Sequence, residues 1–260
     1  HRFATFDGIA KEKRFGIKAA TNLPTDSQKS DKAFEVIPRY WVSEEYRNND
    51  KLSRRLYTDW SITFRDTTNV ISNFRTFVAC VAGETAFNYK APNLVIDEED
   101  SSLRAKKSAL LLAIINSIPF DFITRVKFYG ANLIKNIIEQ LPIIGYDKIS
   151  MVQDEIISRV LKLSYTSDSI KTFAEDLNYF DAPYKFNSNE RFLIKCELDA
   201  VLAHLYCIEK VELAYMLDSF PILRSKEIQQ FEKFRTKETI LRLYDEFAWV
   251  REEVQKAACK

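Results

Sequence analysis

The sequence predicts an α+β protein with a mixed front half, residues 1–146, and a helical back half, residues 147–260. Trp60, Ile62 and Phe64 alternate with polar residues, and this period of two is typical of a half-buried strand. After residue 147 the apolar residues fall instead at helical spacing. With 260 residues, 46% of them hydrophobic, the chain can form one large domain or two small ones.

The first hundred residues predict a long loop and a set of short strands. Residues 8–34 are rich in Gly, Lys, Asn, Pro, Asp and Ser, which is typical of a loop. Four strands are expected, and the third is apolar enough to be central; they lie at residues 35–42, 60–65, 74–81 and 92–96. Between the first two, residues 43–56 predict a polar helix with Ser43 as its N-cap. Three aromatic residues are expected in the core rather than stacked on bases: Trp41, Trp60 and Phe64.

Helices are expected to follow the acidic cluster at residues 97–100. Acidic residues followed by serines are typical of a helix N-terminus. Three helices are predicted, at residues 105–115, 120–129 and 131–140. Pro119 is expected to break or kink the first of them, and Gly130 is a candidate C-cap for the second.

The back half predicts six helices. They are expected at residues 148–163, 168–179, 188–206, 209–218, 225–234 and 237–257. Asn187 followed by Glu190 resembles a capping box, and the pair Phe220 and Pro221 is expected to break the helical run. An apolar stripe at helical spacing is formed by Leu198, Val201, Leu202 and Leu205.

Charge is nearly balanced but unevenly distributed. The net charge is +1, with +4 on residues 1–146 and −3 on residues 147–260. The strongest local excess is in residues 101–146, with six basic residues against Asp121 and Glu139. A mildly basic front half is compatible with a phosphate-contact surface, and equally with a solvated face of mixed charge.

Other composition features exclude several classes. The four cysteines form no C-x-x-C pair and only two histidines accompany them, which argues against a zinc site or a disulfide framework and favours a reducing cytoplasm. The longest apolar run, residues 109–115, is far too short to span a membrane, and no signal peptide is visible. The chain begins without Met, so we expect a fragment of a longer protein.

We expect no active site in this chain. A DNA adenine methyltransferase needs a glycine-bearing turn for its cofactor and an Asn/Asp-Pro-Pro-aromatic tetrapeptide for the flipped adenine, and neither occurs. Residues 97–100 have no acid-x-Lys strand beside them, so a helix start explains them better than a nuclease centre. His204 lies within a strongly patterned helix and is interpreted as a core or surface histidine.

A series of segments, in order along almost the whole chain, carries a family resemblance. They are HRFATFDG at 1–8, YWVS at 40–43, WSITFRD at 60–66, and the segments 69–81, 110–117, 130–143, 163–181, 192–205 and 218–247. Together they resemble the C-terminal specificity region of the Type II restriction enzyme and adenine-specific DNA methyltransferase family. The segments at 110–117 and 130–143 also resemble the recognition domains of Type I specificity subunits.

The resemblance implies a protein that recognises double-stranded DNA for a separate catalytic domain. That upstream methyltransferase domain of the same parent chain would bind S-adenosylmethionine and flip the adenine. This chain would need no cofactor of its own, would contact no membrane, and would read base edges from the other side of the duplex. Residues 147–260 are expected to brace the recognition half against the catalytic domain. Whether the parent also cleaves DNA stays open.

Planar donors and acceptors in the front half are the candidates for DNA contact. The first set is Arg65, Asn69, Asn73, Arg75, Lys127 and Asn132. A second set, expected to contact phosphates, is Arg104, Lys106 and Lys107. The alternative for each is a surface residue without a role, and Asp66 is a candidate partner for Arg65. Two rival functions stay open, a helical adaptor that does not bind DNA and a nuclease.

Overall fold

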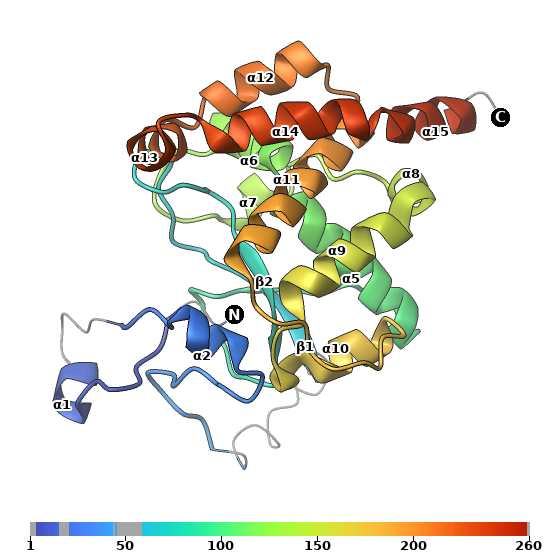
Figure 1. Ribbon diagram of the computed structural model, residues 1–260. Coiled ribbons are helices and arrows are strands. Elements are labelled where there is room, and N and C mark those ends of the chain that lie inside the picture. Colours follow the sequence, from blue (N-terminus) through green and yellow to red (C-terminus); the bar gives the residue numbers. More distant parts are fainter. Residues whose placement is uncertain (1–3, 16–20, 44, 46–58, 259–260) are drawn as a thin grey trace.

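The computed structural model describes residues 4–15, 21–43, 45 and 59–258 (Figure 1). It confirms the α+β class, because a small antiparallel sheet is combined with many helices. The polar helix expected at residues 43–56 lies almost entirely outside the described residues, as does the beginning of the first family-like segment.

The sheet has three antiparallel strands in the order β2-β1-β3. They are β1 (Trp60–Phe64), β2 (Ala79–Gly83) and β3 (Asn93–Leu94). Ile62 lies opposite Val81 on one side and Leu94 on the other, so β1 is the central strand. Trp60, Ile62 and Phe64 are buried as predicted, but Thr63 is buried as well, so the alternation of buried and exposed residues is incomplete. The expectation of a central strand at 74–81 was wrong: β2 begins five residues later and lies at the edge.

The N-terminal part differs most from expectation. Residues 35–42 pair with no strand, so the first expected strand was wrong. Trp41 was wrongly assigned to the core, because 77% of it is exposed. The expected loop at 8–34 contains two short helices, α1 (Lys11–Arg14) and α2 (Asp26–Ser30), the second started by a capping box between Thr25 and Gln28.

Two helices meet at a sharp bend beside the sheet. They are α5 (Ser101–Ile115), capped by Asp100 as the acidic cluster predicts, and α6 (Ile118–Lys127). The bend is 64°, and Pro119 lies in the first turn of α6, where its missing N–H costs nothing. Phe128 ends α6, so Gly130 is not its C-cap. The next helix, α7 (Lys135–Ile138), is shorter than expected.

The back half is mostly helical, with a non-helical connection at residues 177–187. Its elements are α8 (Tyr146–Ile149), η1 (Ser150–Val152), α9 (Gln153–Ser164), η2 (Asp168–Ile170), α10 (Lys171–Asp176), α11 (Ser188–Leu205), α12 (Lys210–Asp218), α13 (Pro221–Phe231), α14 (Arg235–Glu246) and α15 (Ala248–Ala258). Asn187 caps α11 through Asn189 N and Glu190 N, both at 3.0 Å. Two bounds were wrong, because α13 begins at Pro221 and the last expected helix is two helices that meet at Phe247.

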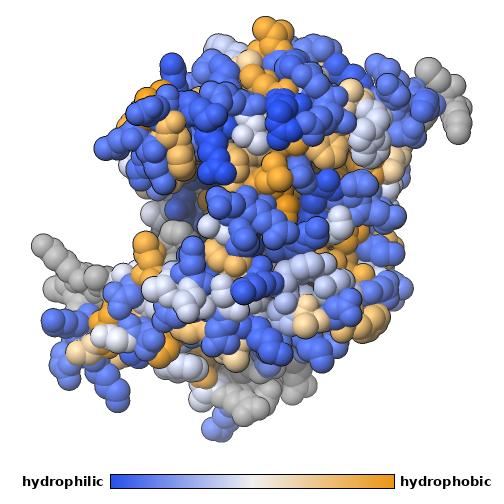
Figure 2. Space-filling model, in the orientation of Figure 1, coloured by the Kyte–Doolittle hydropathy of each residue, from blue (hydrophilic) through white to orange (hydrophobic). Residues whose placement is uncertain are grey.

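The core lies between the sheet and the long helices. One cluster of buried side chains joins β1 and β2 to α5, α9 and α11, so it includes residues on both sides of position 146. The apolar stripe of α11 is buried as predicted. In Figure 1, α12, α13 and α14 lie above this core, and α2 lies below it beside the sheet. Figure 2 shows a mostly hydrophilic face whose outline is indented on the left, between these two parts.

Within the described ranges, no single helix is long and apolar enough to cross a membrane. Together α5 and α6 reach that length and composition, but they are bent and most of their apolar residues are buried in the core.

Candidate functional site

The β1–β2 loop, residues 65–78, carries four of the predicted DNA-contact residues, and α6 fixes its backbone. The Arg125 guanidinium donates to three carbonyls of the loop: Val70 O at 3.0 Å, Asn73 O at 2.9 Å and Phe74 O at 2.9 Å. The same guanidinium lies over the ring of Phe220, 4.5 Å from its centroid. Arg125 therefore connects the turn at residues 70–74 to α6 and to Phe220, the residue that precedes α13.

Asp121 fixes the end of the loop from one helical turn earlier. Its Oδ1 accepts hydrogen bonds from Thr76 N and Phe77 N, both at 2.8 Å, and its Oδ2 lies 3.2 Å from Arg125 Nε. The carboxylate is fully buried. Hydrogen bonds to an ionised group are stronger than those between neutral groups, so this buried ion pair holds residues 70–77 in one conformation. These amides point at Asp121, which explains why β2 begins only at Ala79.

Arg65, Asn69 and Asn73 each form hydrogen bonds within the loop, and each also has surface exposed to solvent. Arg65 is exposed but donates to Thr68 Oγ1 at 3.2 Å and to Arg75 O at 3.0 Å. Partial burial lowers its pKa. Asn69 Oδ1 accepts from the backbone N–H groups of residues 71 and 72, and Asn73 Nδ2 donates to Thr68 Oγ1 at 3.3 Å. Ile71 and Phe74 project outward, 80% and 41% exposed.

Lys127 and Asn132 lie beside this loop. Lys127 ends α6, two residues after Arg125, and it is exposed and makes no ion pair with a residue in the described ranges. Asn132 pairs with Thr67 in an isolated bridge, and its Oδ1 accepts from Lys90 Nζ at 3.0 Å. Lys90 also pairs with Asp66 at 3.1 Å, so Lys90, rather than Arg65, is the ion-pair partner of Asp66.

Sequence reasoning missed two cations next to the loop. Lys90 lies in the β2–β3 connection, and Lys226 of α13 lies 4.2 Å from the centroid of the Phe74 ring. Neither belongs to a motif, and Lys226 is 152 positions from Phe74 in the chain, so only the fold brings them to this surface.

The second predicted set lies elsewhere. Arg104, Lys106 and Lys107 occupy the first two turns of α5, whereas the loop contacts Asn116 at its other end. Twelve helical residues separate those ends by about 18 Å. Arg104 also lies over the Trp60 ring, and Lys107 pairs with Glu98 at 2.7 Å. These three residues therefore do not extend the loop surface.

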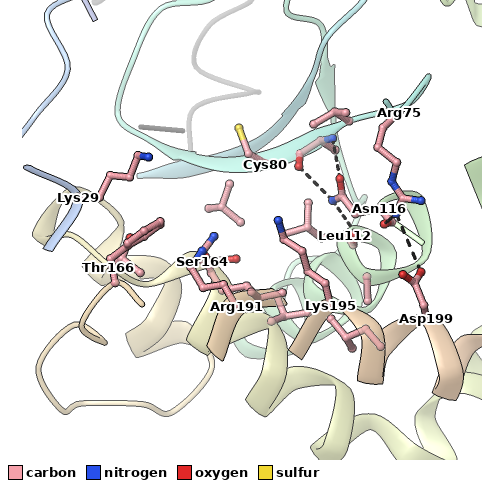
Figure 3. A pocket seen from close by; sticks show the side chains of 18 residues that line it. Lys29, Arg75, Cys80, Leu112, Asn116, Ser164, Thr166, Arg191, Lys195 and Asp199 are labelled. Atoms are coloured by element: carbon pink, nitrogen blue, oxygen red, sulfur yellow. Dashed lines mark hydrogen bonds and ion pairs between the residues drawn. The ribbon is translucent and has the colours of Figure 1, made fainter. Parts of the chain in front are cut away.

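A second region, here called the basic pocket, lies between β2, α5, α9 and α11 and has a cavity volume of about 450 Å³. Four cations and one carboxylate line it (Figure 3): Lys29, Arg75, Arg191, Lys195 and Asp199. Arg75 is the only predicted DNA-contact residue in the pocket. The other cations come from α2 and α11, and no sequence motif links them.

One end of the basic pocket is built on Arg75 and Asp199. Arg75 Nη2 donates to Asn116 O and lies 4.0 Å from Asp199 Oδ1, while its buried Nη1 has no hydrogen-bond partner in the described part of the chain. Asp199 Oδ1 accepts from Ile118 N, the first amide of α6, at 2.6 Å. Burial raises the pKa of Asp199 to about 6, although Arg75 and this hydrogen bond act in the opposite direction.

Lys195 occupies the middle of the basic pocket. Figure 3 shows its side chain pointing from α11 toward β2, into the cavity. It is reached by solvent, yet protein atoms surround it, and the resulting loss of hydration lowers its pKa. Repulsion by Arg191 and Arg75 lowers the pKa further. Lys195 makes no hydrogen bond or ion pair with any residue that the structure describes.

His204 is a structural residue, as the sequence predicts. It is buried, its ring stacks on Tyr244 with centroids 4.0 Å apart, and its Nε2 lies 2.8 Å from Tyr244 O. Within the described ranges, no group of three or more His, Cys, Asp and Glu side chains is placed to hold a metal ion.

Comparison with known proteins gives no relative. No protein-family model matches the chain, and no curated protein or solved structure matches it. The two regions are therefore interpreted from their own residues.

Proposed function

We propose that this chain is the DNA-recognition part of a restriction–modification adenine methyltransferase, which presents duplex DNA to a catalytic domain elsewhere in the parent protein. The observation that carries the proposal is the β1–β2 loop, whose backbone is fixed by the buried Asp121–Arg125 pair while some of its side chains, Arg65 and Asn69 among them, are exposed to solvent. Reading base edges requires donors and acceptors held in a fixed position, and a loop pinned through its backbone meets that need.

The charges around the loop suit a polyanion. Lys127 is free to contact a phosphate, and Lys226 lies over the outward-facing Phe74. The acidic residues of this region, Asp66 and Asp121, are buried and paired with cations. We assign phosphate contacts to Lys127 and Lys226, and base contacts to Arg65 and Asn73, because lysine positions the duplex while planar side chains specify sequence.

The proposal carries further expectations about the parent protein. Catalysis and S-adenosylmethionine belong to the upstream methyltransferase domain, and this chain has no catalytic step assigned to it. Residues 147–260 brace the recognition half against that domain. A cytoplasmic location is part of the proposal, because duplex DNA is the partner.

Fluorescence anisotropy with a labelled random-sequence duplex tests the proposal. The chain is expected to bind at low salt, with a logarithmic slope against salt that shrinks by about one for each phosphate contact removed. Lys127→Gln and Lys226→Gln should each weaken binding to all sequences. The matched control is Lys171→Gln on α10, whose side chain is exposed and paired with Glu175 at 3.3 Å.

Arg65→Gln addresses sequence reading separately. It should reduce discrimination among duplexes more than overall affinity, since a bidentate base contact contributes about 1–3 kcal/mol of discrimination. The proposal fails if the chain does not bind duplex at low salt, or if the three loop-surface variants bind as tightly as the Lys171→Gln control.

A helical adaptor without DNA binding is the second candidate. A groove between α6 and α12 favours it, because the groove is lined by Phe122 and Met216 and bordered by Val211 and Tyr215, which are 76% and 71% exposed. Exposed apolar side chains beside a groove are typical of a protein-contact surface. The anisotropy experiment separates the two, since an adaptor would show no salt-dependent DNA binding.

A further inference from the structure

We propose that the basic pocket binds a phosphorylated small molecule with an apolar or aromatic body, of the size of a nucleoside monophosphate. This site is distinct from the DNA surface assigned above, and the two share only the segment around Arg75.

The charges that line the basic pocket indicate which chemical group the pocket binds. The lining residues include four cations and one carboxylate, and one of the cations, Lys29, is already paired with Asp26 at 3.5 Å. That carboxylate, Asp199, already accepts the first amide of α6 and faces Arg75. A multiply charged anion such as a phosphate matches the remaining positive charge better than a monocarboxylate does.

Two donors in the pocket have no partner in the described ranges. Lys195 Nζ projects into the cavity without a hydrogen bond, and Arg75 Nη1 is buried without one. The Lys195 side chain is exposed to the cavity, so a phosphate bound there would accept directly from its Nζ. Arg75 Nη1 has almost no accessible surface, so Arg75 contributes positive charge beside the cavity rather than a donor that a ligand reaches. Loss of hydration is the main reason for the lowered pKa of Lys195, and repulsion by Arg191 and Arg75 adds to it; an anion would relieve that repulsion.

Size and lining indicate that the ligand is more than an inorganic ion. The cavity volume of about 450 Å³ is within the range of pockets that hold organic ligands. Its floor is apolar and is formed by Val81, Leu112, Val160 and Leu198, and the Phe186 ring lies at the margin near Lys29. An inorganic phosphate would leave this floor uncovered, whereas a nucleoside would cover it.

The shape of the pocket distinguishes this ligand from a duplex. Lys195 lies within a concave space enclosed by β2, α9 and α11, whereas the loop residues assigned to DNA project from the surface. A phosphate of a rigid double helix reaches exposed side chains more readily than the floor of a recess. We therefore assign the pocket to a small ligand.

Isothermal titration of the full chain with adenosine 5′-monophosphate and with inorganic phosphate tests the assignment. Adenosine monophosphate is expected to bind at least tenfold more tightly than inorganic phosphate. Lys195→Gln keeps most of the side chain but removes the charge, and it should weaken nucleotide binding by about tenfold or more, the effect of losing one hydrogen bond to a charged group. Lys171→Gln should bind like the unaltered chain, and thermal melting of both variants verifies that they fold.

Three results would overturn the assignment: no binding of either probe, equal affinity for the two probes, or unchanged nucleotide affinity in Lys195→Gln. A fourth contrary result would be displacement of the nucleotide by duplex DNA, together with a loss of DNA affinity in Lys195→Gln as large as its loss of nucleotide affinity. The pocket would then hold the DNA backbone. The loop variant Lys127→Gln separates the two proposals, because it should weaken DNA binding and leave nucleotide binding unchanged.

Discussion

Replacing Asp121 by alanine should lower the free energy of unfolding by about 3–5 kcal/mol, the usual cost of removing one partner of a buried ion pair. The structure supplies the reasons for so large a loss. The carboxylate is fully buried and accepts two backbone amides at 2.8 Å as well as Arg125 Nε at 3.2 Å. Asp121→Ala leaves two backbone amides and Arg125 Nε without their acceptor, and it leaves the guanidinium charge without its counter-ion.

Urea unfolding followed by circular dichroism measures this loss. The control is Asp218→Ala, which removes an ion pair of 2.6 Å with Lys237 between partly exposed side chains. Such pairs contribute at most about 1 kcal/mol. Asp121→Asn should fall between the two, because its carbonyl oxygen still accepts both amides while its NH₂ group faces a donor on Arg125. A loss for Asp121→Ala no larger than that for Asp218→Ala would refute the reasoning.

Three further predictions concern pH, close packing and exposure. Because burial raises the pKa of Asp199 from 3.8 to about 6, stability should fall by about 2 kcal/mol as pH rises from 4 to 7.5. The urea midpoints at pH 4 and 7.5 measure this fall, and Asp199→Asn should remove it. If the variant and the unaltered chain show the same pH dependence, the prediction is wrong. Gly83→Ala should destabilise by about 1–3 kcal/mol, because its Cβ would lie 2.0 Å from Ser169 O, and an unchanged melting temperature would exclude that clash. Trp60→Ala should lower the free energy of unfolding by about 3–5 kcal/mol, because Trp60 is buried, and Trp41→Ala by less than about 0.5 kcal/mol, because Trp41 is exposed. Equal losses would contradict this difference in burial.

The sequence predicts regular elements well where local chemistry determines them. Asp100 and Asn187 cap α5 and α11 because a side-chain oxygen near a free backbone N–H is a local interaction. The apolar positions of β1 and the apolar stripe of α11 are recognised from spacing alone, and their burial is confirmed.

The expectations that failed depend on contacts between distant residues. Residues 74–78 are apolar enough for a strand. The backbone amides of Thr76 and Phe77, however, donate to Asp121, which is 45 positions from Thr76 in the chain. Trp41 follows a strand-like pattern, yet no strand pairs with it and it stays exposed. Propensity alone does not identify a partner strand.

The candidate site was only partly accessible to sequence reasoning for the same reason. Polar residues in the loop were found because they are close in the chain. The basic pocket was missed, since Lys29 and Lys195 are 166 positions apart and meet only after α2 packs near α11.

The way in which α6 holds the β1–β2 loop has a consequence for evolution and engineering. Arg125 and Asp121 contact only the main chain of residues 70, 73, 74, 76 and 77, and every amino acid except proline supplies those groups. The outward side chains at Ile71, Ser72 and Phe74 can therefore be exchanged without altering the path of the loop. A library randomised at those three positions should retain its fold, so new binding preferences can be selected on an unchanged scaffold.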